Sequence, residues 1–418
     1  MRVLLFGFGS RGDVQPFVAL GKGLQGAGYD VTIAAGVNFQ SWIEQEGLKF
    51  DPVHVDIEAV MQTDIGKNWL EASSHNPMTE LQNMRRMVQV SATGIADDVI
   101  AMLDKYDTFI SGVLTVEPMA AVSQARGKRH LIGLLSPWAP TRSGAAGMQA
   151  PLPRRNSVIN YLMGYVVEVM MSNVLRPASV EVRDRLKLPK PSPATFMRAW
   201  NQTPALIGIS PLVVPPPPDW NAFQQVTGYW FLDADPAWKP SAALAAFLEA
   251  GPPPVYIGFG SMTSRDPEAT LQLLLAALAK SGQRGIIHSG WAGLNSESLP
   301  PNVFLLEGAP HSWLFPRMAA VVHHGGAGTT SAALRAGVPS AVVAHIGDQP
   351  FWGRRIHELG VGAPPLRRHQ LTVDNLSETI HLLMSDAPLR QRASAFGERL
   401  RAEDGIGNAV RAFERFVS

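Results

Sequence analysis

The 418-residue chain contains no cysteine. It therefore has no disulfide framework, no thiolate nucleophile and no cysteine-ligated metal, and this absence fits the reducing cytoplasm in which we expect the protein to reside. A charge excess is missing as well, because 36 Lys and Arg residues balance 35 Asp and Glu residues and leave a net charge of +1. Such a balance lacks the electrostatic footprint of nucleic-acid binding, so we expect no nucleic-acid partner.

Long apolar runs are also scarce. The first residues, Met1–Phe6, lead at once into a glycine turn and are too short for the apolar core of a signal peptide. The most apolar later stretch, Val158–Met171, is interrupted by Asn160, Gly164 and Glu168, and we predict that it is too short and too polar to span a bilayer. No basic amphipathic helix stands out, so we expect at most peripheral membrane contact.

What the chain does have is alternation. Short β-rich runs alternate with helical patterns, which predicts βαβ units and a parallel sheet, and a length of 418 residues favours two domains. The predicted strands are Val3–Phe6, Val31–Ala35, Thr108–Ile110, His130–Leu135 and Ala205–Ile209 in the first half and Val255–Phe259, Gly285–His288, Ala320–His323 and Ser340–Val343 in the second, with helices at Val14–Gly26 and Glu268–Lys280.

Four consecutive prolines, Pro215–Pro218, are the strongest boundary signal. They can continue neither a helix nor a central strand, and they form a stiff spacer. We therefore predict an N-terminal domain at 1–214, a proline-rich linker at 215–235 and a second domain from residue 236 onward.

One short motif occurs twice. Gly7-Phe8-Gly9-Ser10 follows the first predicted strand of the first half, and Gly258-Phe259-Gly260-Ser261 ends the first predicted strand of the second half. The repeat suggests two similar half-proteins that face each other across a cleft.

The run Gly7–Gly12 matches the dinucleotide-binding pattern G-x-G-x-x-G directly after a strand. That pattern also expects an acidic residue at the end of the second strand, to hold the ribose, but here the strand ends in Ala34-Ala35-Gly36. A nicotinamide-dependent oxidoreductase is therefore only a distant alternative.

Asp13 closes the same turn. It could be the N-cap of the helix predicted from Val14, with its carboxylate accepting a backbone N–H. It could instead be a general base at the floor of a cleft, facing an incoming hydroxyl. The sequence leaves both interpretations open.

The stretch His323–Thr330 is the richest in chemistry. A strand ends in two histidines, a glycine turn follows and a helix opens, so that N–H groups, the positive helix end and a hydroxyl suit a diphosphate. An imidazole there could neutralise charge on a leaving phosphate; the alternative is a tight turn with core histidines. Because His323 and His324 point to opposite faces of a strand, we predict that they share no metal ion.

Asp348 and Gln349 precede Pro350, Phe351 and Trp352. A carboxylate beside an amide can recognise vicinal sugar hydroxyls, with an aromatic wall nearby. By itself, however, Asp-Gln-Pro is usually a turn.

In this order and spacing, the chain resembles the UDP-glycosyltransferases of the GT-B fold, and among them the bacterial sterol glucosyltransferases, with the glycopeptide-antibiotic glycosyltransferases as cousins. The resemblance rests on Gly9–Phe17, His323–Thr330 and Gly347–Trp352. It implies two Rossmann-like α/β domains, the second at 236–395, and a final helix at 396–418 that crosses back to the N-terminal domain. It also implies an inverting, metal-independent transfer of glucose from UDP-glucose to a hydroxyl of a lipophilic acceptor such as a sterol, with no cofactor beyond the nucleotide sugar.

The resemblance also implies roles for individual residues, with Asp13 as the catalytic base. It places Ser10, Arg11, Gly12, Ser261, His324, Gly326, Gly328 and Thr329 at the donor diphosphate, Trp291, Ala309 and His311 at the nucleoside, and Asp348 and Gln349 at the donor sugar. Gly308 and Ala332 stand where the better-known plant signature has its leading Trp and its ribose-binding Glu. The choice between uridine and thymidine donors therefore stays open.

The acceptor is expected to lie against the N-terminal domain. Trp138, Met148, Tyr161 and Tyr165 offer adaptable apolar surface beside a Gly- and Pro-rich loop at 137–153, although ordinary core packing is the alternative for each of them. A glycosyltransferase acting on a polyketide, flavonoid or glycopeptide with a UDP- or TDP-sugar is the nearest alternative function. A nucleotide-sugar epimerase and a sugar-nucleotide sensor without catalysis are further ones.

Overall fold

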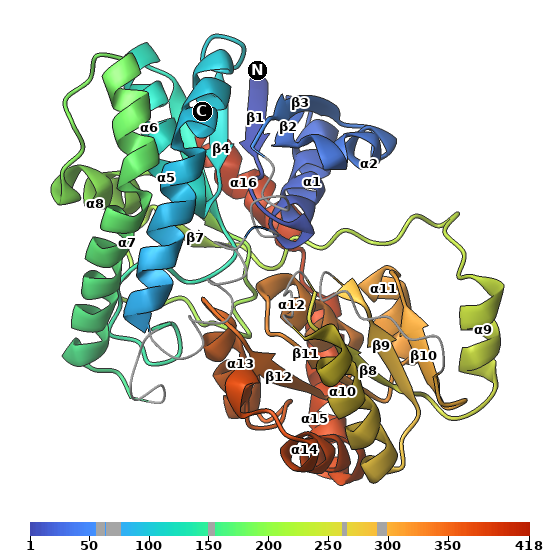
Figure 1. Ribbon diagram of the computed structural model, residues 1–418. Coiled ribbons are helices and arrows are strands. Elements are labelled where there is room, and N and C mark those ends of the chain that lie inside the picture. Colours follow the sequence, from blue (N-terminus) through green and yellow to red (C-terminus); the bar gives the residue numbers. More distant parts are fainter. Residues whose placement is uncertain (56–62, 64–76, 149–154, 261–265, 291–298) are drawn as a thin grey trace. The chain divides into compact units, whose positions relative to one another are not determined.

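The computed structural model describes residues 1–55, 63, 77–148, 155–260, 266–290 and 299–418. The chain divides into two compact units (Figure 1). The first is built from the N-terminal half of the chain, through Leu232, together with the returning segment Asp404–Ser418, and the second is built from Asp233–Glu403. The change of unit at Leu232 falls inside the predicted linker, 215–235.

The first unit is built on a parallel sheet. Among the described residues, seven strands pair in the order β3-β2-β1-β4-β5-β6-β7. They are β1 (Arg2–Phe6), β2 (Asp30–Gly36), β3 (Lys49–Val53), β4 (Thr108–Ser111), β5 (Arg129–Leu134), β6 (Ala205–Ile207) and β7 (Gln224–Val226). The chain builds the sheet outward from β1 in one direction and then returns to place β4 on the other side of β1. The strand order therefore reverses between β1 and β4.

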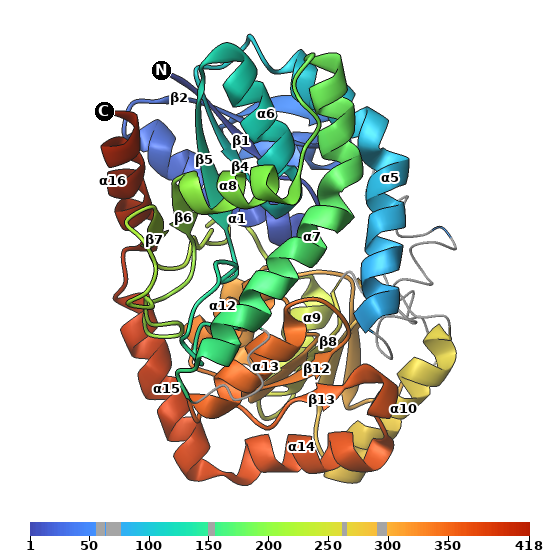
Figure 2. The ribbon, with the colours of Figure 1, turned by 90° about the vertical axis from the view of Figure 1, so that its left-hand side faces the viewer.

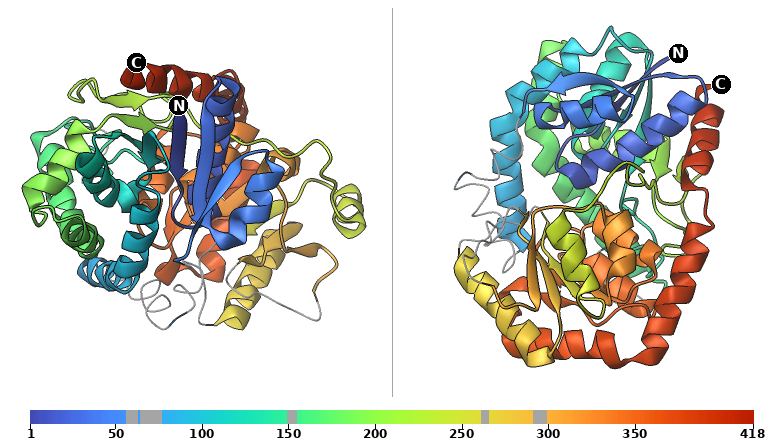
Figure 3. Two further views of the ribbon diagram at one scale, coloured as in Figure 1. Left: turned by 90° about the horizontal axis from the view of Figure 1, so that it is seen from above. Right: turned by 90° about the vertical axis from the view of Figure 1, so that its right-hand side faces the viewer.

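Helices cover both faces of this sheet (Figures 2 and 3). They are α1 (Arg11–Gly26), α2 (Gln40–Gln45), α5 (Pro77–Ala101), α6 (Val116–Arg126), α7 (Val158–Arg185), α8 (Pro193–Gln202) and α16 (Gly405–Val417). Because successive side chains of a strand point to opposite faces, Val3 and Leu5 pack into one buried cluster with α1 and α16, whereas Leu4 and Phe6 pack into another with α5 and α6. Burial on both sides explains why β1 is a continuous apolar run.

The final helix, α16, belongs to the first unit. It begins at Gly405, where the side chain of Asp404 accepts a hydrogen bond from Gly407 N at 2.8 Å. Phe413 is fully buried, and its ring meets that of Tyr29 edge to face at 5.2 Å. Figure 3 shows α16 in dark red beside the blue α1.

The second unit is also built on a parallel sheet. In the described part of the chain, six strands pair in the order β10-β9-β8-β11-β12-β13. They are β8 (Val255–Gly258), β9 (Gly285–His288), β10 (Val303–Leu306), β11 (Ala320–His323), β12 (Ser340–Ala344) and β13 (Leu366–Arg367). Here the strand order reverses between β8 and β11. The accompanying helices are α9 (Ala242–Glu249), α10 (Pro267–Ser281), α11 (His311–Leu314), α12 (Ala327–Ala336), α13 (Gln349–Glu358), α14 (Val373–Ser385) and α15 (Ala387–Arg401).

The proline run lies inside the first unit rather than between the units. Pro215–Pro218 belong to the segment that connects β6 to β7, and β7 adds an edge strand to the first sheet after them. This placement is compatible with proline chemistry, because the run occupies a connection and removes no ladder hydrogen bond from a central strand.

Helix α7 extends beyond the apolar stretch Val158–Met171. The helix begins at Val158 and continues to Arg185, giving 28 residues. Asn160 and Glu168, which suggested an interruption, are only 2% and 4% exposed and face inward, where other segments hydrogen-bond them. The expectation that this stretch is too short to span a bilayer was therefore wrong about its length. By length and composition, α7 is the one helix in the described residues that could cross a membrane, a criterion that core helices of soluble proteins also meet.

Candidate active site

The turn after β1 is built around a glycine that no other residue could replace without strain. Gly9 has a φ of +141°, a conformation that side chains disfavour. A Cβ on Gly9 would lie 2.3 Å from Oδ2 of Asp13. The absence of a side chain at Gly9 is therefore what lets the Asp13 carboxylate fold back over the turn.

Asp13 is the third residue of α1 rather than its N-cap. The helix begins at Arg11, three residues earlier than predicted, and Ser10 takes the N-cap position. Oδ2 of Asp13 accepts hydrogen bonds from Ser10 N at 2.8 Å and from Ser10 Oγ at 3.0 Å. The carboxylate thus reaches back to the N-cap N–H, as in a capping box, while the residue stays exposed to solvent.

Arg11 is held by neighbours in its own unit. Its guanidinium lies over the ring of Trp42, 4.6 Å from the centroid, and its Nε donates to Oε1 of Gln15 at 3.1 Å. Burial lowers the pKa of Arg11 from its ordinary value. The assignments of Ser10, Arg11 and Gly12 to the diphosphate stay predictions.

In the second unit, the predicted diphosphate turn lies where the strand order reverses. His323 ends β11, and α12 opens at Ala327 with Gly326 as its N-cap. Gly326 offers no side-chain cap to the first N–H groups of α12. In open α/β sheets, ligands bind at the carboxyl ends of the strands beside this reversal, and an uncapped helix N-terminus attracts an anion.

His324 is packed between Gly326 of this turn and Gly260, which follows β8. A Cβ on Gly260 would lie 2.8 Å from Cε1 of His324, and a Cβ on Gly326 would lie 2.5 Å from its Nε2. Nε2 therefore faces the N-cap of α12. Burial lowers the pKa of His324 to about 4, although the Gly258 backbone opposes this shift. The imidazole is neutral at pH 7.

His323 plays a different part. It is fully buried, and its Nδ1 accepts a hydrogen bond from Gly325 N at 3.0 Å, which braces the turn. The two imidazole planes of His323 and His324 stand at 87° to each other. Among the described residues, no group of three or more His, Asp or Glu side chains is arranged to hold a metal ion.

Two further histidines that the sequence did not single out belong to this site. His288 ends β9, and His345 follows β12, with its ring 5.2 Å from that of Phe259. Burial lowers the pKa of both imidazoles, that of His345 to about 3, and His324 adds to the effect at His345. The signal was a histidine at the end of each apolar run, but only the strand order β9-β8-β11-β12 brings them around His324.

Asp348 and Gln349 lie at the start of α13 and adjoin the same turn. Gln349 is 5% exposed, and its Oε1 accepts from His345 N at 2.7 Å and from Ile346 N at 3.1 Å. A Cβ on Gly325 would lie 3.1 Å from Cβ of Gln349. Oδ2 of Asp348 accepts from Nε1 of the buried Trp352 at 2.7 Å. The pair therefore also braces the loop after β12, and its contact with a donor sugar stays a prediction.

Of the predicted nucleoside-binding residues, the structure describes Ala309 and His311. Trp291, like Ser261 of the diphosphate set, lies outside the described residues. Ala309 packs against the core of the second unit. His311 stacks on Phe315, with ring centroids 4.2 Å apart and planes 14° from parallel.

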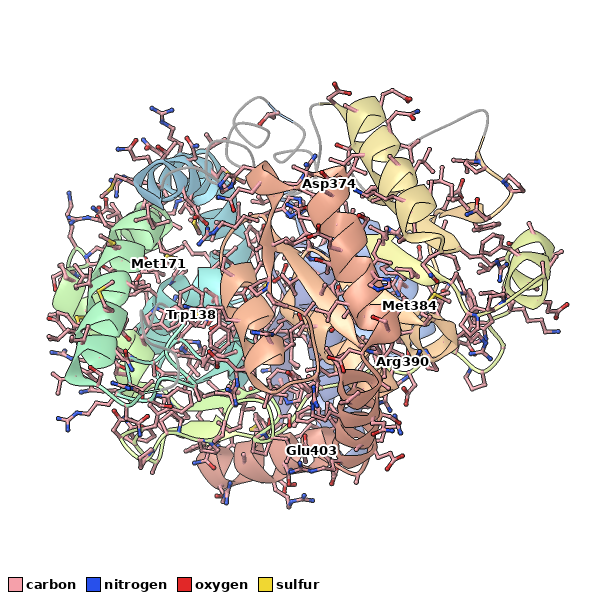
Figure 4. All side chains as sticks on the ribbon, turned by 90° about the horizontal axis from the view of Figure 1, so that it is seen from below. Trp138, Met171, Asp374, Met384, Arg390 and Glu403 are labelled. Atoms are coloured by element: carbon pink, nitrogen blue, oxygen red, sulfur yellow. The ribbon has the colours of Figure 1, made fainter. Side chains whose placement is uncertain are left out.

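The predicted acceptor residues fall into two environments. Trp138, labelled in Figure 4, packs against Trp200 at 5.7 Å, and Trp200 packs in turn against Phe196 at 5.7 Å. Trp200 and Phe196 were not among the predicted acceptor residues; both are buried residues of α8 and reach this cluster through the packing of that helix. Tyr161 and Tyr165 are more than 40% exposed on α7, and Met148 is half-buried.

A buried carboxyl group lies beside this aromatic cluster. Glu168 is 4% exposed, and both of its oxygens accept from Nδ2 of Asn201, at 3.2 and 3.3 Å. Burial raises the pKa of Glu168 to about 7, and the Asn201 hydrogen bond opposes the rise. In addition, Nε1 of Trp200 is buried without a hydrogen-bond partner among the described residues. This region therefore combines aromatic rings with buried polar groups, as small-molecule sites do.

Two family models match the chain. The N-terminal domain of glycosyltransferase family 28 matches residues 3–130, and the C-terminal domain of erythromycin biosynthesis protein CIII-like proteins matches residues 272–406. The first match covers β1 and Asp13, and the second covers α12 and the Asp348–Gln349 pair.

Solved glycosyltransferases share the fold. The glycotransferase of kitacinnamycin superposes with a TM-score of 0.69 at 17% identity, covering 99% of this chain and 98% of that one. The calicheamicin glycosyltransferase CalG4 gives 0.65 at 17% identity, with 100% and 98% covered, and VinC in complex with dTDP gives 0.63 at 20% identity, with 99% and 100% covered. The prediction of two parallel-sheet α/β domains of the GT-B type is confirmed.

Sequence relatives share more. A sterol 3-beta-glucosyltransferase of Arabidopsis thaliana is 35% identical over 100% of this chain and 68% of that protein, and a second from the same plant is 33% identical over 99% and 65%. One from Emericella nidulans is 33% identical over 99% of this chain and 30% of that protein. The chain thus spans about two thirds of the plant relatives, and the expectation of a bacterial branch stays a prediction. These identities show that the chain belongs to the glycosyltransferase family that includes the sterol 3-beta-glucosyltransferases.

Proposed function

We propose that this glycosyltransferase transfers glucose from UDP-glucose to a hydroxyl of a sterol or a similar polycyclic alcohol, with inversion at the anomeric carbon and without a metal ion. The observation that carries the proposal is the uncapped N-terminus of α12 at the strand-order reversal of the second unit, with His324 facing it. The relatives are sterol 3-beta-glucosyltransferases, which supports glucose as the sugar and a sterol 3-hydroxyl as the acceptor.

The donor diphosphate would bind at the first turn of α12. Its negative charge is attracted by the N–H groups of Ala327, Gly328 and Thr329 and by the positive helix end. The histidines are buried and neutral before binding, so each can donate only one hydrogen bond unless the phosphate draws a proton onto it. With the N–H groups of α12 and the histidines bound to the phosphates, no divalent cation is needed to hold them.

The transfer itself is a single displacement. The acceptor oxygen forms a bond to the anomeric carbon while the bond from that carbon to the β-phosphate oxygen breaks, and UDP leaves with the electron pair. Asp13 takes the proton of the acceptor hydroxyl as the general base, and His324 and α12 stabilise the charge that develops on the departing diphosphate. Attack opposite the leaving group converts an α-linked donor into a β-glucoside.

The acceptor would lie in the first unit beside Trp138, Trp200 and Phe196. Trp138 is half-buried and offers flat apolar surface for a polycycle, and the buried rings of Trp200 and Phe196 support it from behind. The unpartnered Nε1 of Trp200 and the carboxyl group of Glu168 supply polar groups that can orient it.

The test is transfer with purified protein. UDP-glucose, UDP-galactose and dTDP-glucose are each offered with a panel of sterols, flavonoids and polyketides, in the presence and absence of EDTA, and products are identified by mass spectrometry and by the proton coupling at the anomeric position. We expect a sterol β-glucoside from UDP-glucose at a rate that EDTA leaves unchanged. Transfer to a flavonoid or polyketide but to no sterol, an α-linked product, or loss of transfer in EDTA would each overturn the corresponding part of the proposal.

A further inference from the structure

The first third of α7 is apolar where it faces solvent. Of the twelve large apolar side chains that the described residues expose, seven lie between Val158 and Val166. Ile159 is 56% exposed, Leu162 55% and Tyr165 43%. We call these exposed side chains, from Val158 to Val166, the α7 apolar face. In a helix that meets only water, this arc would be polar, and a concentrated apolar patch marks a contact surface.

The inward side of the same helix segment is polar and small. Nδ2 of the buried Asn160 donates to the carbonyl oxygens of Arg142 at 3.0 Å and Arg155 at 2.9 Å. Gly164 lies against Pro140, where a Cβ would come within 3.0 Å of the proline Cα. These contacts fix the rotation of the helix about its axis. The α7 apolar face is therefore built to point outward and cannot turn inward without breaking them.

The sequence that leads into this face is basic, and two of its arginines lie exposed at the N-terminal end of α7. The chain has no Asp or Glu between Pro118 and Val167, whereas the same stretch contains six basic residues, Arg126, Lys128, Arg129, Arg142, Arg154 and Arg155. Arg142 and Arg155 are exposed at the N-terminal end of α7. The Asp219 carboxylate, which accepts from Thr141 Oγ1 at 2.6 Å and from Arg142 N at 2.7 Å, offsets one of these charges. The exposed Arg155 keeps this end of the helix basic, which favours an anionic contact.

The rest of α7, beyond Glu168, is not available for such a contact. Beyond Glu168, the helix packs into the first unit through buried Val174, Leu175 and Val182, and Arg183 forms a buried ion pair with Glu117 at 2.6 Å. A helix tied down in this way cannot cross a bilayer. It can only present its first third to a surface.

We propose that the α7 apolar face docks onto the surface of an anionic lipid bilayer, with its aliphatic side chains entering the acyl boundary and Arg142 and Arg155 meeting the headgroups. Tyr161 and Tyr165 are the side-chain type that settles at the headgroup level, and basic residues near the surface add attraction to anionic lipids. The biological purpose rests on the proposed function: a sterol acceptor resides in a bilayer, and docking brings the Trp138 region of the first unit close to it.

The experiment is co-sedimentation with phosphatidylcholine vesicles, with and without phosphatidylglycerol, in the absence of any donor. Two double variants are compared with the unsubstituted protein: Leu162→Ser/Val166→Ser on the α7 apolar face, and Val37→Ser/Val90→Ser, which replaces valines of the first unit that are 57% and 65% exposed elsewhere. We expect the unsubstituted protein and the Val37/Val90 control to sediment with the anionic vesicles, and the α7 variant to bind them about tenfold more weakly. Arg142→Gln/Arg155→Gln should lose the preference for phosphatidylglycerol.

The outcome is separable from the proposed function because binding is measured without catalysis. If the unsubstituted protein glucosylates a sterol, the α7 variant should keep this activity when the sterol is in detergent micelles and lose it when the sterol is in vesicles. The proposal is overturned if the unsubstituted protein stays in the supernatant with both kinds of vesicle, or if the α7 variant sediments as the control does. It is also overturned if the variant only converts a dimer into a monomer in sedimentation velocity, because the face would then join two copies of the chain.

Discussion

The turn after β1 and the turn after β11 are built alike but differ in the charge at the N-terminus of the helix that follows. Each joins a parallel strand at the reversal of its sheet to a helix through glycines. In the first unit, the third helical residue is Asp13, whose carboxylate bonds back to Ser10 N. In the second unit, the third helical residue is Thr329, and the N-cap is Gly326 without a side-chain cap. One helix N-terminus already holds an anion of its own, and the other is open to an anionic ligand.

The comparison explains why the glycine pattern near the N-terminus does not mark a dinucleotide site here. A phosphate at the start of α1 would meet the negative charge of Asp13, so the helix dipole is already used internally. At α12, the same dipole is available to a diphosphate. The residue at the third helical position, and not the glycine spacing, separates the two.

The first prediction concerns Asp13→Asn. The amide oxygen can still accept from Ser10 N, so we expect the turn to stay folded, with a melting temperature close to that of the unsubstituted protein. The amide cannot take a proton from the acceptor hydroxyl, so kcat should fall about 1000-fold, within the usual range for loss of a general base. Steady-state turnover and the binding of UDP-glucose by calorimetry check this, and binding should change little.

A matched control comes from the second unit. Asn375 holds the third position of α14, and its Oδ1 accepts from Thr372 N at 3.0 Å, as Asp13 does at α1. Asn375→Ala should lower stability by about 1 kcal/mol and leave kcat unchanged. If Asp13→Asn keeps normal turnover, Asp13 serves only to close its turn, and the difference between the two turns has no catalytic meaning.

The second prediction concerns a variant that gives the turn after β11 the carboxylate found in the turn after β1. Thr329→Asp places a carboxylate at the third position of α12, where it stabilises the helix end by about 0.3–1 kcal/mol. The same charge repels a diphosphate, and we expect UDP-glucose affinity to fall about 100-fold, or roughly 3 kcal/mol. Thr329→Asn is the uncharged control and should weaken binding only a few-fold.

Isothermal titration of both Thr329 variants decides the matter. If Thr329→Asp and Thr329→Asn lose the same amount of UDP-glucose affinity, the Thr329 hydroxyl governs donor binding, and the attraction of the helix N-terminus for an anion does not. A gain of melting temperature together with a loss of affinity in Thr329→Asp alone is the expected pattern.

Much of the fold was predictable because buried parallel strands are continuous apolar runs. The predicted strand Ala320–His323 matches β11, and Val3–Phe6 matches β1 to within one residue. The strands at the sheet edges were missed: β3 contains Lys49, Asp51 and Pro52, and β7 is only Gln224–Val226. β3 and β7 carry polar residues or proline, as edge strands can because they need not be covered on both sides, and they leave no apolar run to detect. The edge strand β10 (Val303–Leu306) is an apolar run that was nevertheless not predicted.

The sequence identifies candidate site residues where the motif is local, and it misses neighbours that only the fold brings together. Asp13, His324 and Thr329 stand in contiguous motifs next to their turns. His288 and His345 are far apart in the chain and surround His324 only because β9 and β12 flank β8 and β11. Similarly, the polar residues of α7 suggested an interruption because the partners that satisfy them, such as Asn201, are remote in sequence.

The last prediction is the pH dependence of donor binding, which separates the helix end from the histidine beside it. His324 has a pKa of about 4 in the free protein, and a bound diphosphate next to its Nε2 raises that pKa because it favours the charged imidazole. Binding then takes up protons between the two pKa values, so UDP-glucose affinity should increase about tenfold, or roughly 1.4 kcal/mol, as the pH falls from 8 to about 5.5. UDP-glucose is the right probe because its diphosphate carries no terminal phosphate that titrates in this range. His324→Gln should bind more weakly at low pH and lose the slope. If the slope is the same in both proteins, the α12 N-terminus holds the diphosphate without proton uptake at His324.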